Sequence, residues 1–315
     1  MVLVADAISP PIQLHTLLTG FRLGGGQDWS SDVALVLQVT AVTLYLTGVY
    51  RLRRRGRRWP VGRTVAFLSG VIVLFVALVS GLAAYDDTNF SAHVVQHLLL
   101  MMAGPPLLAM GAPLTLALQA LPRRGQSRLA RVLHSRPVGV ATAPLVAATL
   151  YYSSMWVDMQ SSFYPFSLRH PLAHDASHLV MFTLGCLFWW PVVGRDEMAR
   201  RPHPAVRLAM IALGMPFESF LAIALMSVTS PVAPQHTLAD THNGGSIFWI
   251  GAMSVTAVAV LVAAAGWMRT DERDARRADR TDSEPDPDDA WAAAWRARTG
   301  SVPSFIETPA RTPTP

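Results

Sequence analysis

Long apolar runs alternate with short polar or charged connections over most of the chain. Seven such runs lie near residues 32–50, 64–85, 93–121, 138–157, 172–193, 205–229 and 244–268. Each run is long enough to cross a hydrocarbon core of about 30 Å as a helix that rises about 1.5 Å per residue. The pattern therefore predicts an all-α, polytopic membrane protein with seven transmembrane helices.

The connections between these runs differ in charge. Those after the first, third and fifth runs, and the segment after the seventh, carry almost all of the 26 basic residues, every one of which is Arg. The other connections and the N-terminal segment hold only Arg22 and Arg169. Since cytoplasmic loops keep an excess of positive charge, we expect the N-terminus outside and the C-terminus in the cytoplasm.

Composition agrees with this division of the chain. Half of the residues are apolar and only 15% are charged, against about a quarter in a soluble domain, so the net charge of +5 does not indicate nucleic-acid binding. We expect an external segment over residues 1–31, a membrane domain over 32–268 and a disordered cytoplasmic tail over 269–315, which is rich in Arg, Asp, Glu, Pro and Thr. The stretch WAAAWRAR in this tail is also compatible with a short helix at the membrane surface.

The third apolar run is the longest and contains Gly104, Pro105, Pro106 and Pro113. Proline removes a backbone donor and clashes with the preceding helical turn, so we expect a kink near Gly104–Pro106. Cys186 is the single cysteine, which excludes a disulfide within the chain and a metal clamp built from paired cysteines.

Histidines are distributed unevenly across the predicted membrane. Two of the ten, His134 and His203, fall in cytoplasmic connections. The other eight fall on the outer side and are His15, His93, His97, His170, His174, His178, His236 and His242. The bias of membrane topology concerns Arg and Lys and not neutral histidine, so this asymmetry indicates a function on the outer side.

Two histidine pairs have helical spacing. His93 and His97 begin the third run, and His174 and His178 begin the fifth; residues four apart share one helix face. Met101 continues the first pair one turn deeper. His170 precedes Pro171, His242 stands beside Asp240 in the last outer connection, and Met155 and Met159 end the fourth run. Two pairs at matched depth predict one metal or haem site, provided that the two helices are neighbours.

The ligand types favour copper. Imidazole and thioether groups suit copper ions, and methionine suits Cu(I) in particular. Zinc would prefer a closed Cys/His set or a carboxylate, and calcium or magnesium would need several oxygen ligands, which we do not expect on this side. For Met101, Met155 and Met159 taken alone, packing against lipid or in the core is favoured over metal binding.

Glu218 is an acidic residue deep inside the sixth run. Carboxylates within a membrane are costly and are usually functional or paired. Metal transfer, proton movement and a hydrogen bond to a neighbouring helix all remain open for it.

Several segments resemble a known family. HVVQHLLLMMAGPPLLAMGAPL in the third run, HPLAHDASHLVMFTLGCLFWWPVVG in the fifth and LADTHNGGSIFW before the seventh are similar to the signature segments of the CtaG-type cytochrome c oxidase assembly factors. The resemblance covers about residues 35 to 268. It implies a seven-helix membrane protein, thought to supply copper to the copper B centre of a haem–copper oxidase. The implied site residues are His93, His97, His170, His174, His178 and Asp240, with His242 as a departure from the usual motif.

We therefore predict a non-enzymatic, copper-binding assembly factor of the plasma membrane, with its metal site on the outer side. Its partners would be the catalytic subunit of the oxidase and an external copper donor protein. Two alternatives stay open: a copper importer, and a haem b protein with two axial histidines. A retinal protein is excluded because the chain has no Lys, and the HExxH motif of metalloproteases is absent.

Overall fold

The computed structural model describes residues 29–196, 202–283 and 287–300, and within these ranges every regular element is helical. This confirms the all-α fold class. The chain divides into two compact units, residues 1–263 and 264–315, which are described separately. His15 and the external N-terminal segment lie almost wholly outside the described residues, whose first element begins at Trp29.

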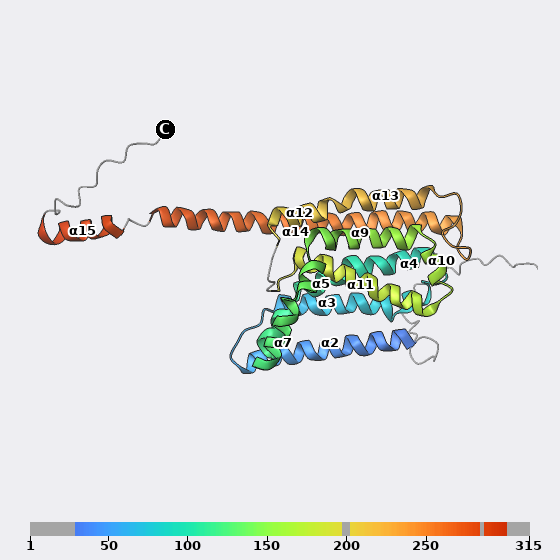
Figure 1. Ribbon diagram of the computed structural model, residues 1–315, viewed down its shortest axis with the longest axis horizontal. Coiled ribbons are helices and arrows are strands. Elements are labelled where there is room, and N and C mark those ends of the chain that lie inside the picture. Colours follow the sequence, from blue (N-terminus) through green and yellow to red (C-terminus); the bar gives the residue numbers. More distant parts are fainter. Residues whose placement is uncertain (1–28, 197–201, 284–286, 301–315) are drawn as a thin grey trace, which may run out of the picture. The chain divides into compact units, whose positions relative to one another are not determined.

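The first unit is built from long helices that run side by side (Figure 1). In chain order they and the short helices between them are α2 (Trp29–Arg54), α3 (Val61–Leu78), the 3-10 turn η1 (Gly81–Ala84), α4 (Phe90–His97), the π-helical segment η2 (Leu98–Ala103), α5 (Gly104–Met110), α6 (Pro113–Ala120), α7 (Arg123–Leu133), α8 (Arg136–Ala141), α9 (Pro144–Gln160), α10 (Phe163–Ser167), α11 (Pro171–Val193), α12 (Pro204–Ala212), α13 (Gly214–Ser227) and the start of α14 (Leu238–Ser283).

Within the described ranges, six helical stretches are long and apolar enough to cross a membrane. They are Trp29–Arg54, Val61–Ala84, Phe90–Ala120, Pro171–Val193, Pro204–Ser227 and Leu238–Arg273. They correspond to six of the seven predicted spans. The remaining one, expected near 138–157, is occupied by α8 and by α9, which has 17 residues. A multi-pass membrane protein is therefore supported, while the count of seven and the orientation of the termini stay predictions.

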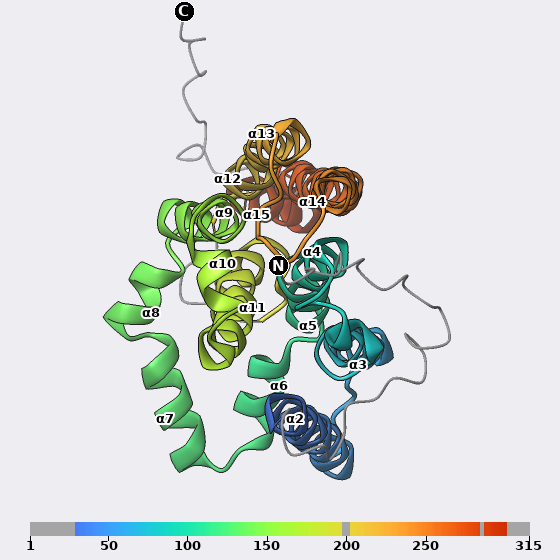
Figure 2. The ribbon, with the colours of Figure 1, turned by 90° about the vertical axis from the view of Figure 1, so that its right-hand side faces the viewer.

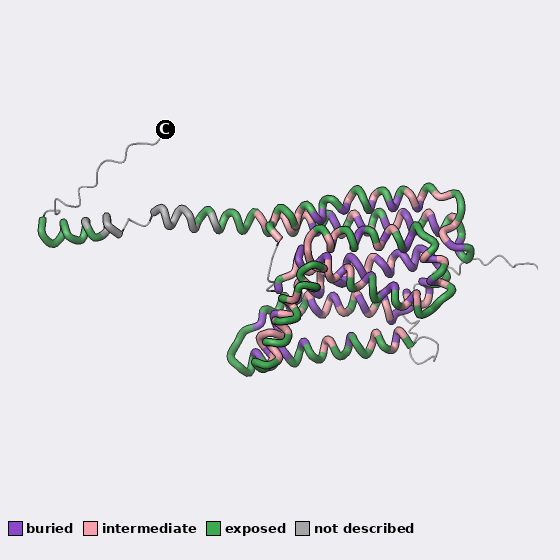
Figure 3. The backbone as a smooth tube through the Cα atoms, viewed as in Figure 1, coloured by how far each residue is buried: buried purple, intermediate pink, exposed green. Residues whose placement is uncertain are grey.

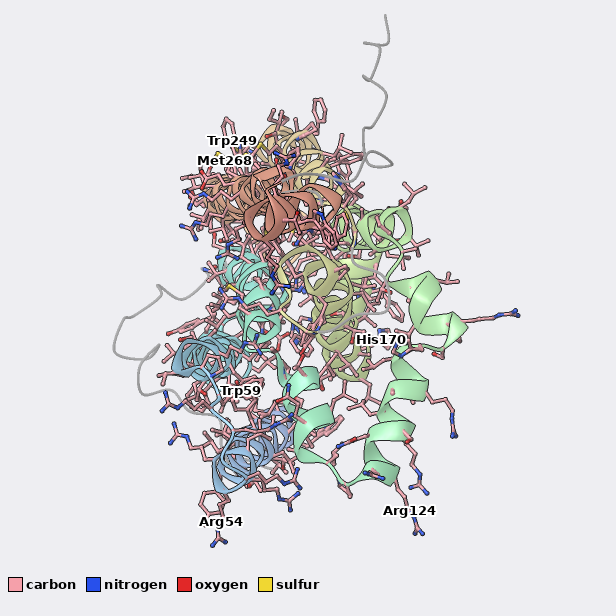
Figure 4. The ribbon with its side chains drawn as sticks, turned by 90° about the vertical axis from the view of Figure 1, so that its left-hand side faces the viewer. Arg54, Trp59, Arg124, His170, Trp249 and Met268 are labelled. Carbon is pink, nitrogen blue, oxygen red and sulfur yellow. The ribbon has the colours of Figure 1, made fainter. Side chains whose placement is uncertain are left out.

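The connections rich in arginine lie at one end of the first unit, and α10 and the beginning of α4 lie at the other (Figure 1). Arg55 Nη1 donates to the Gln119 carbonyl at 3.1 Å, which joins the connection after α2 to the end of α6. Figure 4 shows Arg54 and Arg124 pointing outward from this end. The separation of arginine from histidine that the sequence predicts is thus present in the fold.

The third apolar run occupies the centre of the unit. Its segments η2 and α5 pack against α3 on one side and α11 on the other, and α9 packs on α11 (Figure 2). The two helices that carry the histidine pairs are therefore neighbours, as a shared site requires. Buried residues concentrate on these central helices, whereas α2 is largely exposed (Figure 3), as expected for a helix that faces lipid.

The central helix departs from α-geometry where its prolines predict a disturbance. Pro105 and Pro106 have no N–H to offer the carbonyls of Met101 and Met102 one turn earlier, and the preceding six residues form the π-helical segment η2. Gly185 of α11 lies so close that a Cβ there would be 2.9 Å from the Met101 carbonyl oxygen. The widened turn and this glycine bring the two helix backbones together just below the histidines.

Past the prolines, the chain breaks again before α6. Ala112 adopts a left-handed conformation with φ 51°, the one non-glycine residue with positive φ in the described part of the chain. Asp196, from the connection after α11, accepts a hydrogen bond from Thr115 N at 2.6 Å and another from Trp190 Nε1 at 2.8 Å. A buried carboxylate from a distant segment thus caps the N-terminus of α6.

Glu218 of α13 is buried and joins two helices. Thr256 Oγ1 of α14 lies 3.0 Å and 3.3 Å from its two carboxylate oxygens and donates to them. Among the three roles that the sequence leaves open, the geometry shows the hydrogen bond to a neighbouring helix.

In the second unit, α14 continues to Ser283 and α15 covers Pro287–Thr299, so the WAAAWRAR stretch is helical. Trp291 and Trp295 stack with ring centroids 5.3 Å apart. The expected disordered and cytoplasmic character of the tail stays a prediction.

Candidate metal centre

Two side chains fix the start of α4 and so position its histidine pair. Asn89 Oδ1 accepts a hydrogen bond from Ala92 N at 3.0 Å, which is a local helix cap. The Asp240 carboxylate of α14 accepts from Phe90 N at 2.6 Å, from Ser91 N at 3.1 Å and from Ser91 Oγ at 2.6 Å. A carboxylate at a helix N-terminus also interacts favourably with the helix dipole. Asp240 therefore anchors α4 to α14.

The start of α11 is set by proline. Pro171 occupies the first helical turn, where its fixed φ suits the helix and its missing N–H leaves no bond unmade. His174 and His178 follow on one face, one turn apart, and both are buried. On α4, His93 and His97 are also buried.

The four imidazole rings form one cluster. Ring centroids are 4.1 Å apart for His93 and His97, and 4.5 Å apart for His174 and His178. Between the helices, His93 lies 5.6 Å from His174, and His97 lies 5.8 Å from His178. The structure thus brings together four of the histidines that the spacing selects.

Asp158, near the end of α9, lies beside both histidines of the α4 pair. One of its oxygens, Oδ2, lies 3.4 Å from His93 Nε2 and 3.4 Å from His97 Nδ1. Its side chain is only 1% exposed. A carboxylate in so buried a position needs partners of this kind.

Asp86 and Asp87, in the connection before α4, serve the α11 pair. His174 Nε2 lies 3.2 Å from Asp86 Oδ2 and 3.4 Å from Asp87 Oδ1, and His178 Nε2 lies 3.8 Å from Asp86 Oδ2. The Asp87 side chain is 53% exposed, whereas that of Asp86 is 6% exposed. This connection therefore supplies both a buried and an accessible carboxylate.

One nitrogen of each ring lacks a hydrogen-bond partner. Among the described residues, the structure offers none to His93 Nδ1, His97 Nε2, His174 Nδ1 or His178 Nε2, all of which are buried. Histidines that bind metals usually pass their other ring N–H to a carboxylate, which fixes the ring and its tautomer. His93, His97 and His174 each have a carboxylate beside one nitrogen, which can either orient the ring in this way or bind a metal ion together with it.

A second polar chain borders the cluster. The Tyr164 ring lies 4.4 Å from the His93 ring, and Tyr164 Oη lies 2.9 Å from His236 Nε2. Burial lowers the pKa of His236, and Asp240 opposes this effect only in part; burial also raises the pKa of Tyr164 well above its usual value. Both groups are thus kept neutral, and their hydrogen-bonded pair borders the histidine cluster beside His93.

Four predicted site residues take other positions. His170 is exposed, stacks on Phe166 and has Nδ1 2.9 Å from the Phe166 carbonyl (Figure 4 labels it). His242 Nε2 donates to the Val228 carbonyl at 3.0 Å. Asp240 caps α4, as described above. Met101 belongs to the hydrophobic core, together with Met155 and Met159.

The three carboxylates beside the histidines were missed from the sequence. The expectation that this side offers few oxygen ligands is wrong, since Asp86, Asp87 and Asp158 all lie there. A signal was present: Asp158 is an acidic residue at the end of an apolar run, a position that is costly without a purpose. Asp86 and Asp87 directly precede the run that carries the first histidine pair.

In the part of the chain that the structure describes, three groups of side chains are close enough to hold a metal ion. They are His93 with His174 and His178, His93 with His97 and Asp158, and Asp86 with Asp87 and His174; within each group the ligand atoms lie within 4.8 Å of one another. Mixed imidazole and carboxylate donors suit Cu(II), Zn²⁺ and other first-row ions. The arrangement can therefore bind a transition-metal ion.

Comparison with known proteins identifies the family of this chain. The names of the similar proteins describe no activity. The sequence model of the family described as "Cytochrome c oxidase caa3 assembly factor" matches residues 43–270, in agreement with the resemblance carried by the histidine segments. The chain is 34% identical over 255 residues to uncharacterized proteins of Mycobacterium bovis and Mycobacterium tuberculosis, and 31% identical over 266 residues to one of Mycobacterium leprae. These alignments cover 75–78% of this chain and 38–40% of the relatives, so the chain spans about two fifths of their length. No solved structure matches it.

Proposed function

Because the chain belongs to the family of cytochrome c oxidase caa3 assembly factors, we propose that it binds copper and helps to deliver it to the copper B centre of a haem–copper oxidase. The family implies an oxidase as partner, and the metal would be received by the catalytic subunit of that enzyme. An external copper donor protein would load the site. This role is non-enzymatic, and it places the protein in the plasma membrane with the histidines on the outer side.

One observation carries the proposal: four buried imidazoles from two helices meet in one cluster, and each of them keeps a nitrogen without a hydrogen-bond partner among the described residues. Burying polar nitrogens without partners costs about 1–3 kcal/mol each. A bound metal ion would satisfy several of them at once. A purely structural cluster would be expected to pair them internally.

The donor set bears on the oxidation state of the copper. The histidines suit both Cu(I) and Cu(II), whereas the carboxylates favour Cu(II) and Zn²⁺ more than the sequence suggests. We keep copper as the cargo, because the oxidase that the family assembles needs it at a histidine site within the membrane. A donor at a similar depth would spare the ion a passage through lipid.

The packing favours small ions over haem. Two axial histidines must leave an open slot for the macrocycle between them. Here the rings of His97 and His174 lie 5.8 Å and 4.5 Å from that of His178, and Tyr164 covers His93. An absorption spectrum of the purified protein tests this point directly, since bound haem has a strong Soret band.

A copper importer is the second candidate. It would need ligands that continue toward the arginine-rich end, and Glu218, an acidic group deeper in the bundle, is held by Thr256. This favours a site that exchanges ions at one end of the bundle.

The experiment is complementation of a deletion strain under limiting copper. The wild-type gene should restore oxidase activity, and the His97→Ala/His174→Ala variant should not, while added copper should restore activity to the variant in part. Cellular copper content is measured in parallel. Fully active oxidase in the variant at limiting copper would refute the proposal, and a fall in cellular copper with normal assembly after copper addition would favour the importer.

A further inference from the structure

The possible metal ligands divide into two sets that share no residue. The buried set is His93, His97 and Asp158; the rim set is Asp86, Asp87 and His174. Within each set, one ligand atom of every residue lies within 4.8 Å of the other two. Three protein ligands are enough for a metal site that keeps one position open for exchange. Each set could therefore hold an ion by itself.

The two sets differ in access. In the buried set, the exposed fractions of the side chains are 1% for His93, 4% for His97 and 1% for Asp158. In the rim set, Asp87 is 53% exposed, and Asp86 and His174 are 6% and 8% exposed. An ion from outside the protein can thus meet Asp87 first, whereas the buried set is reached only past other side chains.

His178 lies between the two sets. Its ring is 4.5 Å from that of His174 and 5.8 Å from that of His97, and its Nε2 is 3.8 Å from Asp86 Oδ2. With His93 from the buried set and His174 from the rim set it forms the third group of possible ligands. An ion that moves from the rim set to the buried set through this group would keep at least one of its ligands at each step.

Charge also favours more than one cation. Three carboxylates are placed around four histidines, and two of the carboxylates, Asp86 and Asp158, are buried. Buried carboxylates are costly unless positive charge lies nearby. Two metal ions about 3.5–4 Å apart share one site in several classes of protein, so two ligand sets within one cluster have a precedent.

We propose that the centre holds two copper ions, one in the rim set and one in the buried set, and that ions enter at the rim and pass to the buried set by way of His178. The inference rests on the proposed copper function and deepens it. It gives the site a loading position and a storage position.

The test is the copper stoichiometry of the purified full-length chain in detergent, measured by elemental analysis after loading with Cu(II) and removal of weakly bound metal. Wild type should bind two ions per chain. Asp158→Asn and the double variant Asp86→Asn/Asp87→Asn should each bind one. His170→Ala, an outer histidine outside both sets, is the matched control and should bind two. The ion that each carboxylate variant retains also shows that it has folded.

Kinetics separate the two positions. A water-soluble Cu(II) chelator in excess should remove copper from wild type in a fast and a slow phase. The Asp86→Asn/Asp87→Asn variant should lose the fast phase, and Asp158→Asn should lose the slow one. A His178→Ala variant should keep both ions after equilibration but fill the slow position at least tenfold more slowly.

The outcomes are distinct. One ion in wild type, lost together in all carboxylate variants, would overturn the two-ion site and leave the copper delivery function standing. Two ions in every variant would overturn the assignment of the sets. No copper in wild type would overturn both the inference and the proposed function, whereas two ions in wild type together with full complementation by a variant that binds none would count against delivery alone.

Discussion

The two histidine pairs have the same spacing and different surroundings. On α4, the rings of His93 and His97 are 4.1 Å apart and share a single oxygen of Asp158, which comes from α9. On α11, the ring of His174 has two carboxylates beside it, Asp86 and Asp87, from the connection before α4. The first pair is enclosed, and the second borders an accessible carboxylate.

The spacing of two histidines therefore predicts that their rings lie together, but it does not predict what the pair binds or how accessible it is. Residues four apart face the same way on any helix, so HxxxH tells which rings act together. What the pair can do depends on the carboxylates, which orient the rings and set the local charge. Because those carboxylates come from other elements, two identical motifs can serve as the inner and the outer half of one centre.

The largest effect should come from replacing one pair at a time. In the complementation strain at limiting copper, His93→Ala/His97→Ala should reduce oxidase activity to the level of the deletion, because the buried position is lost. His174→Ala/His178→Ala should reduce it less, since the buried ligands remain. Oxidase activity per unit of membrane protein measures both, with protein levels checked by immunoblot. Equal loss in both variants would mean that the pairs act as one indivisible site.

Gly185→Ala should disturb both pairs without touching a ligand. The new Cβ would lie 2.9 Å from the Met101 carbonyl oxygen and 2.9 Å from Pro105 Cγ, so α11 must move away from the central helix. Overpacking of this kind costs about 1–3 kcal/mol, and the separated pairs should bind copper more weakly. Thermal unfolding in detergent, with and without copper, reports both effects.

The matched control for this variant is Gly139→Ala, because a Cβ at Gly139 has no atom within 4 Å. It should unfold at the temperature of the wild type. If Gly185→Ala also unfolded at that temperature and kept its copper affinity, close approach of the two helices would not be what forms the centre.

Substitutions of Asp240 and of Asp158 should affect different properties: the first lowers the stability of the fold, and the second weakens copper binding. Asp240→Ala removes three hydrogen bonds from the start of α4, and loss of such a cap costs about 1–2 kcal/mol, while both ions should still bind. Asp158→Asn should leave the stability of the metal-free protein unchanged or higher, because it removes a buried charge, and should reduce the stabilisation that copper provides. Melting temperatures measured over a copper titration distinguish the two.

Features of this centre that depend on residues close together in the sequence are predictable from it, whereas features that depend on packing between distant segments are not. The pairs are predictable, because helical periodicity is local, and so is the disturbance at Pro105–Pro106. The family resemblance confirmed by the comparison adds the oxidase. The contact between α4 and α11, in contrast, is a property of helix packing, which a single sequence does not contain.

Asp240 and Asp158 both show that long-range contacts are not predictable from one sequence. Asp240 is expected as a ligand and is a helix cap, whereas Asp158 is not expected and lies beside two histidines. Asp240 is expected among the metal ligands because it precedes a glycine pair in a segment that resembles a family motif, yet it caps a helix 150 residues away in the chain. Caps are sought next to the helix they serve, where Asn89 is indeed found. Asp158 stands alone in its segment, so only the folded chain reveals its two histidine neighbours.

The smallest effect is expected from His170→Ala, although the family resemblance places this residue with His174 and His178. Its side chain is exposed and interacts with Phe166 and the Phe166 carbonyl, so the substitution should change stability by less than about 0.5 kcal/mol. Copper stoichiometry and oxidase activity at limiting copper should equal those of wild type. A clear loss of activity with both ions still bound would instead assign His170 to contact with a donor or acceptor protein, because an exposed histidine beside the rim can act on an ion only while it is being exchanged.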